Sequence, residues 1–389
     1  MRIRQSFLIV VAAIFVLTVM LFVLWRRFSL PVERFFSEKY KRVSFYYSAQ
    51  TGDSMAQYLL GQENEAKKDY AAAIKWYRKA AEQGNSKAQF RLGSLTASGT
   101  GVTRDLAEAA EWYRKAAEQG NSDAQTALGA CFFLGIGVKQ DDKEAAKWYS
   151  LAAQQYNFGA MWRLGDCYYW GRGVEKDYGE AFRLYRAAAG VPGTFGDTVA
   201  QYRLGKCYAR GTGIEKNPAE AVKWYRASAE DGFFLAQRIL GDCYFFGDLT
   251  ERNFAEAVKW YRKAAEQGDA VAHFNLGWCY EAGQGVEKNL AEAMNWYRKA
   301  AELGNALAQY TMGVYYANGH GVAQNLVEAV KWFRKAAAQG NAEAQYCLGM
   351  AYVQGDGVEK NRAEAEKWLR KAAEQGHPKA IEPLKKMGN

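Results

Sequence analysis

The chain has 389 residues, of which 49% are hydrophobic and only 5 are proline. This composition supports a large buried core and excludes a disordered chain. The formal net charge is +9, but eight basic and two acidic residues among the first fifty supply 8 − 2 = +6, which leaves +3 for the other 339 residues. A nucleic-acid-binding function therefore has little electrostatic support.

The first predicted element is an apolar helix of 19 residues, Phe7 to Trp25, whose only polar member is Thr18. At about 1.5 Å per residue such a helix spans about 28 Å, close to the hydrocarbon thickness of a bilayer. The alternative is a cleaved signal peptide, but its apolar run is usually about 7–15 residues long and ends at a small-residue cleavage site. The sequence therefore predicts an uncleaved transmembrane helix at 7–25, after a short basic tail at 1–6.

Basic residues flank this predicted helix unevenly. Six Lys or Arg residues lie at positions 26–42, just after the predicted helix, whereas only Arg2 and Arg4 precede it. Because positive flanks tend to stay in the cytoplasm, the imbalance favours a single-pass protein of the cell (inner) membrane whose remaining chain lies on the cytoplasmic side. A short basic tail is also typical of anchors that export the rest of the chain, so the periplasmic side stays open.

From residue 53 onward the chain repeats itself with a period of 36 residues. The first unit is shortened to 32 residues, and the fourth is lengthened to 40 by residues 191–195. The units begin at Ala56, Ala88, Ala124, Ala160, Ala200, Ala236, Ala272, Ala308 and Ala344. The sequence predicts about nine helix-turn-helix repeats over 53–379.

Each unit opens with an amphipathic helix that carries a glycine in its middle. In the second unit, Ala88, Leu92 and Leu95 fall on one helical face, and Gly93 lies beside them. A mid-helix glycine costs about 1 kcal/mol relative to alanine, and every unit has one. We therefore expect a bulky neighbour to approach each glycine closely, and the tryptophan that recurs in the second helix, such as Trp112, is the predicted neighbour.

The second helix of each unit is followed by a glycine and then by Asn or Asp in most units. These residues suit a left-handed C′ position and the N-cap of the next helix. A Gly-x-Gly-Val loop joins the two helices of most units, as at 99–102. It comes after a helix, not a strand, and lacks a third glycine, which argues against nucleotide binding. Its valine is predicted to pack back onto the core.

Both ends of the array are predicted to be caps. Residues 26–52 contain a basic juxtamembrane segment followed by an N-terminal capping helix. This helix resembles a degenerate second helix of a repeat, with Phe45, Ser48 and Ala49 in the places of the Tyr and two Ala of a full repeat. Residues 380–389 form a polar C-terminal capping segment.

Cysteines recur once in each of units three to seven, always two residues after the mid-helix glycine, at Cys131, Cys167, Cys207, Cys243 and Cys279. Equivalent positions on stacked helices lie about 8–10 Å apart, beyond the ~7 Å Cα limit for a disulfide. Buried thiols that fill a core slot are therefore favoured over a metal or redox role.

These motifs resemble the Sel-like repeat (SLR) family, relatives of the tetratricopeptide repeat. The shared features are the 36-residue period, Ala-Gln-x-x-Leu-Gly, Gly-x-Gly-Val and Ala-x-Lys-Trp-Tyr-Arg-Lys-Ala-Ala, found along residues 53–389. The resemblance implies an all-α fold, a right-handed α-α superhelical solenoid of antiparallel helix pairs, used as an adaptor, scaffold or host-interaction module. Family members that bind penicillin carry paired cysteines within each repeat, which this chain lacks, so that activity is not expected.

Catalytic motifs are missing from the sequence. The three histidines, His273, His320 and His377, are scattered, and no HExxH, Ser-x-x-Lys or Gly-x-Ser-x-Gly motif occurs. The sequence therefore predicts no enzyme, no metal and no small-molecule cofactor.

A candidate binding surface is predicted from position within the first helix. With the mid-helix glycine as zero, positions −3, +1 and +5 lie opposite the core face, and in the resembled family this side lines a concave groove. We call these positions in units four to seven the groove stripe. Its predicted partner-binding residues are Trp162, Asp166, Trp170, Tyr202, Lys206, Arg210, Asp242, Phe246 and Trp278. Packing between neighbouring helices is the alternative for the −3 rings, whereas Trp170, Phe246 and Trp278 suit anchoring of a partner.

The sequence thus predicts a membrane-anchored, non-enzymatic scaffold or adaptor that binds a partner protein or peptide through this groove. The alternative is a protein on the outer side of the membrane that binds or regulates cell-envelope glycans such as peptidoglycan, because aromatic rings also stack on sugars. No nucleic-acid partner is expected. The membrane side of the repeats separates the two hypotheses best.

Overall fold

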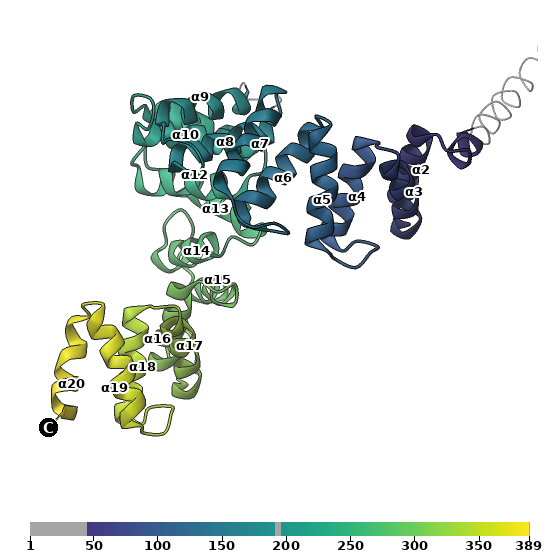
Figure 1. Cartoon of the computed structure of the whole chain (residues 1–389). Coiled ribbons are helices and arrows are strands. Elements are labelled where there is room, and N and C mark those ends of the chain that lie inside the picture. Colours follow the sequence, from purple (N-terminus) through teal and green to yellow (C-terminus); the bar gives the residue numbers. More distant parts are fainter. Residues whose placement is uncertain (1–44, 191–195, 389) are drawn as a thin grey trace, which may run out of the picture. The chain divides into compact units, whose positions relative to one another are not determined.

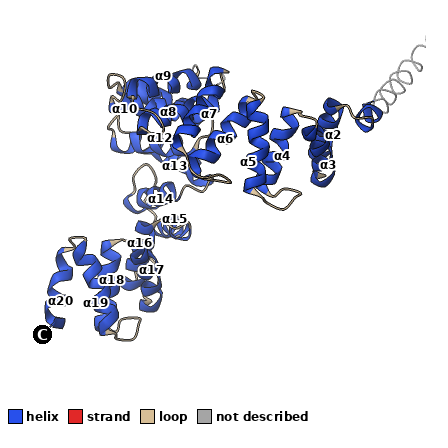
Figure 2. Cartoon of the chain, viewed as in Figure 1, coloured by secondary structure: helices blue, strands red, loops and turns tan. Residues whose placement is uncertain are grey.

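The computed structural model describes residues 45–190 and 196–388, and all of these residues lie in helices or in the turns and loops between them (Figure 2). No strand occurs in these two ranges. The predicted transmembrane helix at 7–25, the basic residues around it and the lengthened turn at 191–195 lie outside the described residues. Among the described helices, none combines the length and apolar character needed to cross a bilayer.

Nine helix pairs succeed one another along the described chain (Figure 1), which confirms the predicted all-α repeat solenoid. The first helices of the pairs are α2 (Ser54–Ala66), α4 (Ser86–Ser98), α6 (Ser122–Leu134), α8 (Phe158–Trp170), α10 (Thr198–Arg210), α12 (Phe234–Phe246), α14 (Ala270–Ala282), α16 (Ala306–Asn318) and α18 (Ala342–Gln354). The second helices are α3 (Tyr70–Glu82), α5 (Leu106–Glu118), α7 (Asp142–Gln154), α9 (Tyr178–Ala189), α11 (Pro218–Glu230), α13 (Phe254–Glu266), α15 (Leu290–Glu302), α17 (Leu326–Ala338) and α19 (Arg362–Glu374). A short 3₁₀ helix, η1 (Pro378–Ala380), and α20 (Ile381–Gly388) close the chain.

The repeats fall into two compact units. Repeats one to three belong to the first unit, which ends at Asn157, and repeats four to nine belong to the second, which begins at Phe158. The groove stripe lies wholly in the second unit.

Helix caps form where the sequence predicts them. The side chain of Asn85 accepts a hydrogen bond from the Ala88 amide at 3.0 Å at the start of α4. Asp105 does the same for the Ala107 and Glu108 amides at the start of α5, at 2.9 Å each. In the loop before α15, Gly285 has φ +74°, and a Cβ there would lie 2.2 Å from the carbonyl oxygen of Phe254. Only glycine fits this close approach.

The glycine in the middle of each first helix packs against a side chain from the second helix of the same repeat. A Cβ added to Gly241 would lie 2.6 Å from both Cδ1 and Cε1 of Tyr261, closer than real Cβ contacts. The corresponding side chains of the other repeats are Tyr77, Tyr113, Tyr149, Tyr185, Tyr225, Tyr297, Phe333 and Leu369. The prediction that tryptophan packs against this glycine is therefore wrong. The side chain of the next residue, about 100° further around the helix, packs there instead.

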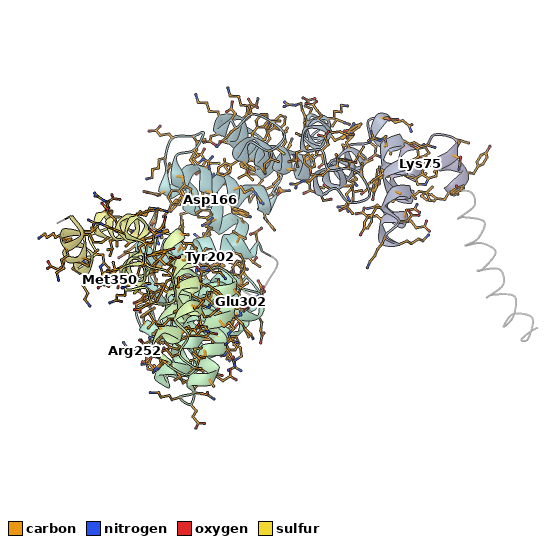
Figure 3. The ribbon with its side chains drawn as sticks, turned by 90° about the horizontal axis from the view of Figure 1, so that it is seen from below. Lys75, Asp166, Tyr202, Arg252, Glu302 and Met350 are labelled. Atoms are coloured by element: carbon orange, nitrogen blue, oxygen red, sulfur yellow. The ribbon has the colours of Figure 1, made fainter. Side chains whose placement is uncertain are left out.

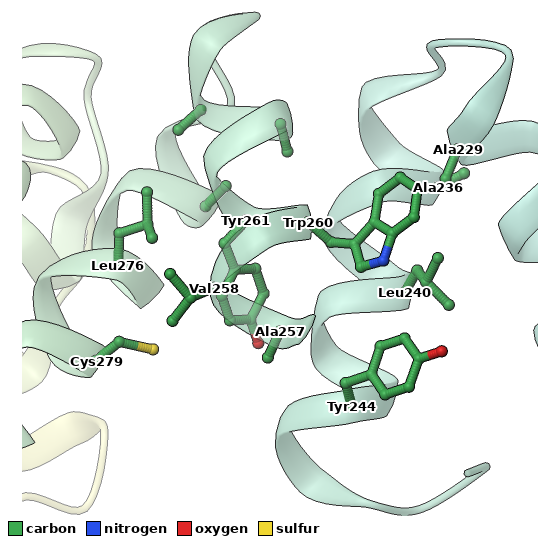
Figure 4. Close-up of a cluster of buried hydrophobic side chains, with 13 residues drawn as sticks. Ala229, Ala236, Leu240, Tyr244, Ala257, Val258, Trp260, Tyr261, Leu276 and Cys279 are labelled. Carbon is green, nitrogen blue, oxygen red and sulfur yellow. The ribbon is translucent and has the colours of Figure 1, made fainter. Parts of the chain in front are cut away.

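The tryptophan instead joins successive repeats. Trp260 belongs to a cluster with Ala229 of α11 and with Ala236 and Leu240 of α12, so it contacts both the preceding repeat and its own (Figure 4). The ammonium of Lys263 lies 4.3 Å from the centroid of the Trp260 ring and covers it from the solvent side. Such a cation–π contact adds to the apolar burial of the indole.

A buried glutamine also connects neighbouring repeats. The Gln237 side-chain amide donates to the carbonyl of Ala229 at 3.0 Å, and its oxygen accepts from the Gln267 side chain at 2.8 Å. One residue thereby joins the ends of α11, α12 and α13. The same pair of bonds is made by Gln57, Gln89, Gln125, Gln309 and Gln345.

The predicted N-terminal cap keeps the repeat register. Residues 45–50 are helical, Ala49 is fully buried, and Phe45 packs against the cluster that contains Ala49 and Trp76. The Gln57 amide bonds to the carbonyl of Ala49, as Gln89 bonds to Ala81 one repeat later. This equivalence places residues 45–50 where the second helix of a preceding repeat would lie.

The cysteines fill core positions, as predicted. The five with the repeating spacing are buried, and Cys347 is half-buried. Burial raises the pKa of Cys243 and of Cys279 to about 12.

Candidate partner-binding site

The groove stripe lies on α8, α10, α12 and α14, and its three most exposed rings are those at +1 or +5. Trp170 is 59% exposed, Phe246 61% and Trp278 39%. Apolar side chains that gather in one exposed patch can mark a protein-interaction site. The positions where the sequence predicts anchors are therefore accessible to a partner.

The rings at −3 are largely occupied by packing inside the repeat array. Tyr202 lies 5.9 Å from the Tyr225 ring and 5.5 Å from that of Phe233. Trp162 is half-buried, donates its indole N–H to Asp197 at 3.1 Å and stacks under Arg163. These contacts account for the −3 rings as packing residues.

The two acidic residues at +1 accept hydrogen bonds from the tyrosines that face the mid-helix glycines. Asp166 accepts from the Tyr185 hydroxyl at 2.6 Å and pairs with Arg203 at 2.9 Å. Asp242 accepts from the Tyr261 hydroxyl at 2.8 Å. A buried hydroxyl needs such an acceptor.

The Asp242 carboxyl is itself largely withdrawn from water, and this changes its pKa. Desolvation raises the pKa of the Asp242 carboxyl, and the Tyr261 hydroxyl and Arg238 offset part of that rise. Burial, with the nearby Asp242 charge, also raises the pKa of Tyr261 above its ordinary value. Asp166 and Asp242 thus hold the second helix in place and have little capacity left for a partner.

The basic residues of the stripe differ from the acidic ones. Within the described part of the chain, neither Lys206 nor Arg210 forms an ion pair, although Lys206 is half-buried and Arg210 is exposed. Burial, together with Arg203 and Arg210, lowers the pKa of Lys206. Figure 3 labels two other residues of the stripe, Asp166 of α8 and Tyr202 of α10.

An apolar recess of about 220 Å³ opens between α12 and α14. The Phe245 ring lies 5.0 Å from Phe246 and 5.1 Å from Trp278, both edge-to-face. We call it the aromatic recess, and it is lined by Phe245, Phe246, Tyr261, Phe274, Asn275 and Trp278. The +5 position of one repeat and the +1 position of the next therefore meet at one site that can receive an apolar side chain.

Two further hollows were not predicted. In the first compact unit a polar hollow of about 640 Å³ is lined by Tyr58, Gln62, Glu65, Ala66, Lys87, Phe90, Arg91, Asn121 and Asp123. In the second unit a hollow of about 330 Å³ lies among α16, α17 and α18 and includes Cys347 and Met350. An ion pair of Arg91 with Glu65 crosses the first hollow from α4 to α2.

Metal-binding residues do not gather anywhere in the described ranges: no group of three His, Cys, Asp or Glu side chains there could hold an ion. His273 takes the place of the buried glutamine in repeat seven, with its ring 5.5 Å from that of Trp296 and Nδ1 2.9 Å from the Asp269 carbonyl oxygen. Its contacts are those of a packing residue.

The fold and this exposed aromatic face define an α-helical repeat solenoid of the protein-interaction class. The Sel1 repeat model matches the chain nine times, at residues 54–85, 86–121, 122–157, 159–189, 198–233, 235–269, 270–305, 306–341 and 342–377. The chain belongs to the Sel1 repeat family, as its motifs predict, and this repeat is in general a non-enzymatic protein-interaction fold.

Two solved structures are similar over most of their length. One is c5321 of uropathogenic Escherichia coli, a protective antigen with an SLR fold, at 37% identity and TM-score 0.61 over 88% of this chain and 81% of that one. The other is a Sel1 repeat protein from Oxalobacter formigenes, at 35% identity and TM-score 0.60 over 81% of this chain and 90% of that one. A comparison with curated proteins gave no match.

Proposed function

We propose that this chain is a membrane-tethered scaffold that captures a segment of a partner protein on the groove stripe. The observation that carries the proposal is the exposure of Trp170, Phe246 and Trp278 on first helices of one compact unit, with an apolar recess beside two of them. Exposed aromatic side chains around a recess are typical anchors in protein recognition. The family supports a protein partner.

The tether is the apolar segment 7–25, which has the length and composition of a membrane-spanning helix. The basic excess after it supports a cytoplasmic position of the repeats in the inner membrane. Alkaline phosphatase fused after Asn389 should therefore be inactive in cells. High phosphatase activity would place the repeats on the outer side of the membrane and favour the glycan-binding alternative.

The groove is tested by affinity capture from native membranes with the full-length chain and its Trp170→Ala, Trp278→Ala double variant. Truncation of an aromatic anchor costs about 2 kcal/mol or more, roughly thirtyfold in affinity, so the double variant should lose its partners. The matched control is Leu303→Ala with Leu307→Ala, two apolar side chains of similar exposure away from the stripe. If the double variant keeps its partners while circular dichroism shows intact helices, the groove proposal is wrong.

A further inference from the structure

Three basic residues lie on successive turns along one side of α10. Arg203 is paired with Asp166 at 2.9 Å, but Lys206 and Arg210 lack a carboxylate partner in the part of the chain that the structure describes. Lys206 lies 5.7 Å from the centroid of the Tyr202 ring and is half-buried. A partly desolvated ammonium beside two guanidinium groups repels them, and an incoming anion would relieve that repulsion.

Two carboxylates on α12 and α14 do not pair with these cations, because donors from other side chains already occupy them. Asp242 accepts from Tyr261 at 2.8 Å and lies 3.4 Å from Arg238. Glu281 accepts from the Tyr297 hydroxyl at 2.6 Å. The face therefore presents two cations without a carboxylate partner on α10, beside the apolar recess between α12 and α14.

The basic cluster and the aromatic recess belong to one continuous face of the second compact unit. The Arg203–Asp166 pair joins α10 to α8. The rings of Tyr202 and Phe233, 5.5 Å apart, join α10 to the start of α12. Phe245 and Trp278 join α12 to α14 at 5.1 Å. A single extended segment can thus reach both features.

We infer that the partner segment is acidic and carries a large apolar side chain, whose carboxylates pair with Lys206 and Arg210 while the apolar side chain enters the aromatic recess. This inference rests on the proposed function and names the chemistry of its partner. A protein segment is favoured over nucleic acid because residues 51–389 have a formal charge of only +3, which offers little to neutralise a phosphate backbone.

The test is fluorescence anisotropy of dye-labelled twelve-residue peptides with the full-length chain in detergent. The first peptide has a central Trp between Glu pairs, the second has Lys in place of each Glu, and the third has Ala in place of Trp. The protein variants are Lys206→Glu with Arg210→Glu, and Trp278→Ala. The matched control is Arg186→Glu with Arg298→Glu, which changes the net charge equally at exposed positions of second helices.

The acidic Trp peptide should bind more tightly than the other two. The double charge reversal should weaken it by roughly tenfold or more, with a smaller effect at high salt, and the control should leave it unchanged. Equal or tighter binding of the Lys peptide, or an unchanged affinity after charge reversal, overturns this inference. If charge reversal has no effect but Trp278→Ala weakens binding of the acidic Trp peptide, the acidic partner is ruled out while binding at the aromatic recess is supported. The inference of an acidic partner segment is also overturned if a mixed-sequence oligonucleotide competes with the peptide, or if no peptide binds. The proposed function is decided separately, by the capture experiment.

Discussion

Replacing Gly241 by alanine tests the packing that defines each repeat. The new Cβ would lie 2.6 Å from two carbons of the Tyr261 ring, which is only 1% exposed and cannot swing into solvent. In an open helix the same substitution would stabilise the protein by up to about 1 kcal/mol. Overpacking a tight core costs about 1–3 kcal/mol. We therefore expect a net loss of about 1–2 kcal/mol.

The assay is urea unfolding of the full-length chain, monitored by far-ultraviolet circular dichroism. Gly179→Ala in α9 is the control without a ring contact: its Cβ would meet only the Asp177 side chain, at 3.3 Å, so its effect should lie between neutral and a stabilisation of about 1 kcal/mol. In a Tyr261→Ala background the clash is gone, so Gly241→Ala should become stabilising. Equal stabilisation by Gly241→Ala and Gly179→Ala in the wild-type background would refute the ring-on-glycine packing.

Three further outcomes are expected from the core. Trp260→Ala should lower the free energy of unfolding by about 3–5 kcal/mol, whereas the Trp170, Trp278 double variant should unfold at the same urea concentration as the wild type. Gln237→Ala removes two buried hydrogen bonds and should cost about 1–3 kcal/mol, measured in the same assay against exposed Gln354→Ala. Because burial raises the pKa of Cys243 and Cys279 from the ordinary 9.0 to about 12, the folded chain keeps protons that the unfolded chain loses. Stability should therefore fall as pH rises above 9, and a flat profile from pH 8 to 11 would contradict the buried thiols.

The repeat register could be predicted because its elements recur in most or all of the nine units. The 36-residue spacing, the mid-helix glycine and the Asn or Asp before most first helices all reappear in the structure at the expected places. The partner of the glycine could not be predicted from the same pattern. Trp260 and Tyr261 are adjacent and both buried, so only their orientation, about 100° apart, decides which ring meets Gly241.

The candidate site was predictable only in part, for the same reason. Periodicity correctly leaves Trp170 and Phe246 on the surface. Periodicity does not show that Asp242 accepts a hydrogen bond from the Tyr261 hydroxyl, because that hydrogen bond depends on the orientation of the tyrosine. The polar hollow of the first unit is lined in part by Tyr58, Gln62 and Ala66, which hold positions −3, +1 and +5 of the first repeat. It was missed because the groove stripe was limited to units four to seven. Partner binding by the stripe stays a prediction.

The buried glutamines have a consequence for how such a chain can change length. Gln237 of repeat six donates to the carbonyl of Ala229, and Gln309, two repeats later, donates in the same way to the carbonyl of Ala301. If residues 306–341 were deleted, α15 would meet α18, and Ala301 would offer Gln345 an equivalent carbonyl, while α14 and its Trp278 would stay in place. Gene rearrangements that add or remove whole modules should therefore be tolerated, and the reach of the protein can evolve separately from the surface that recognises its partner.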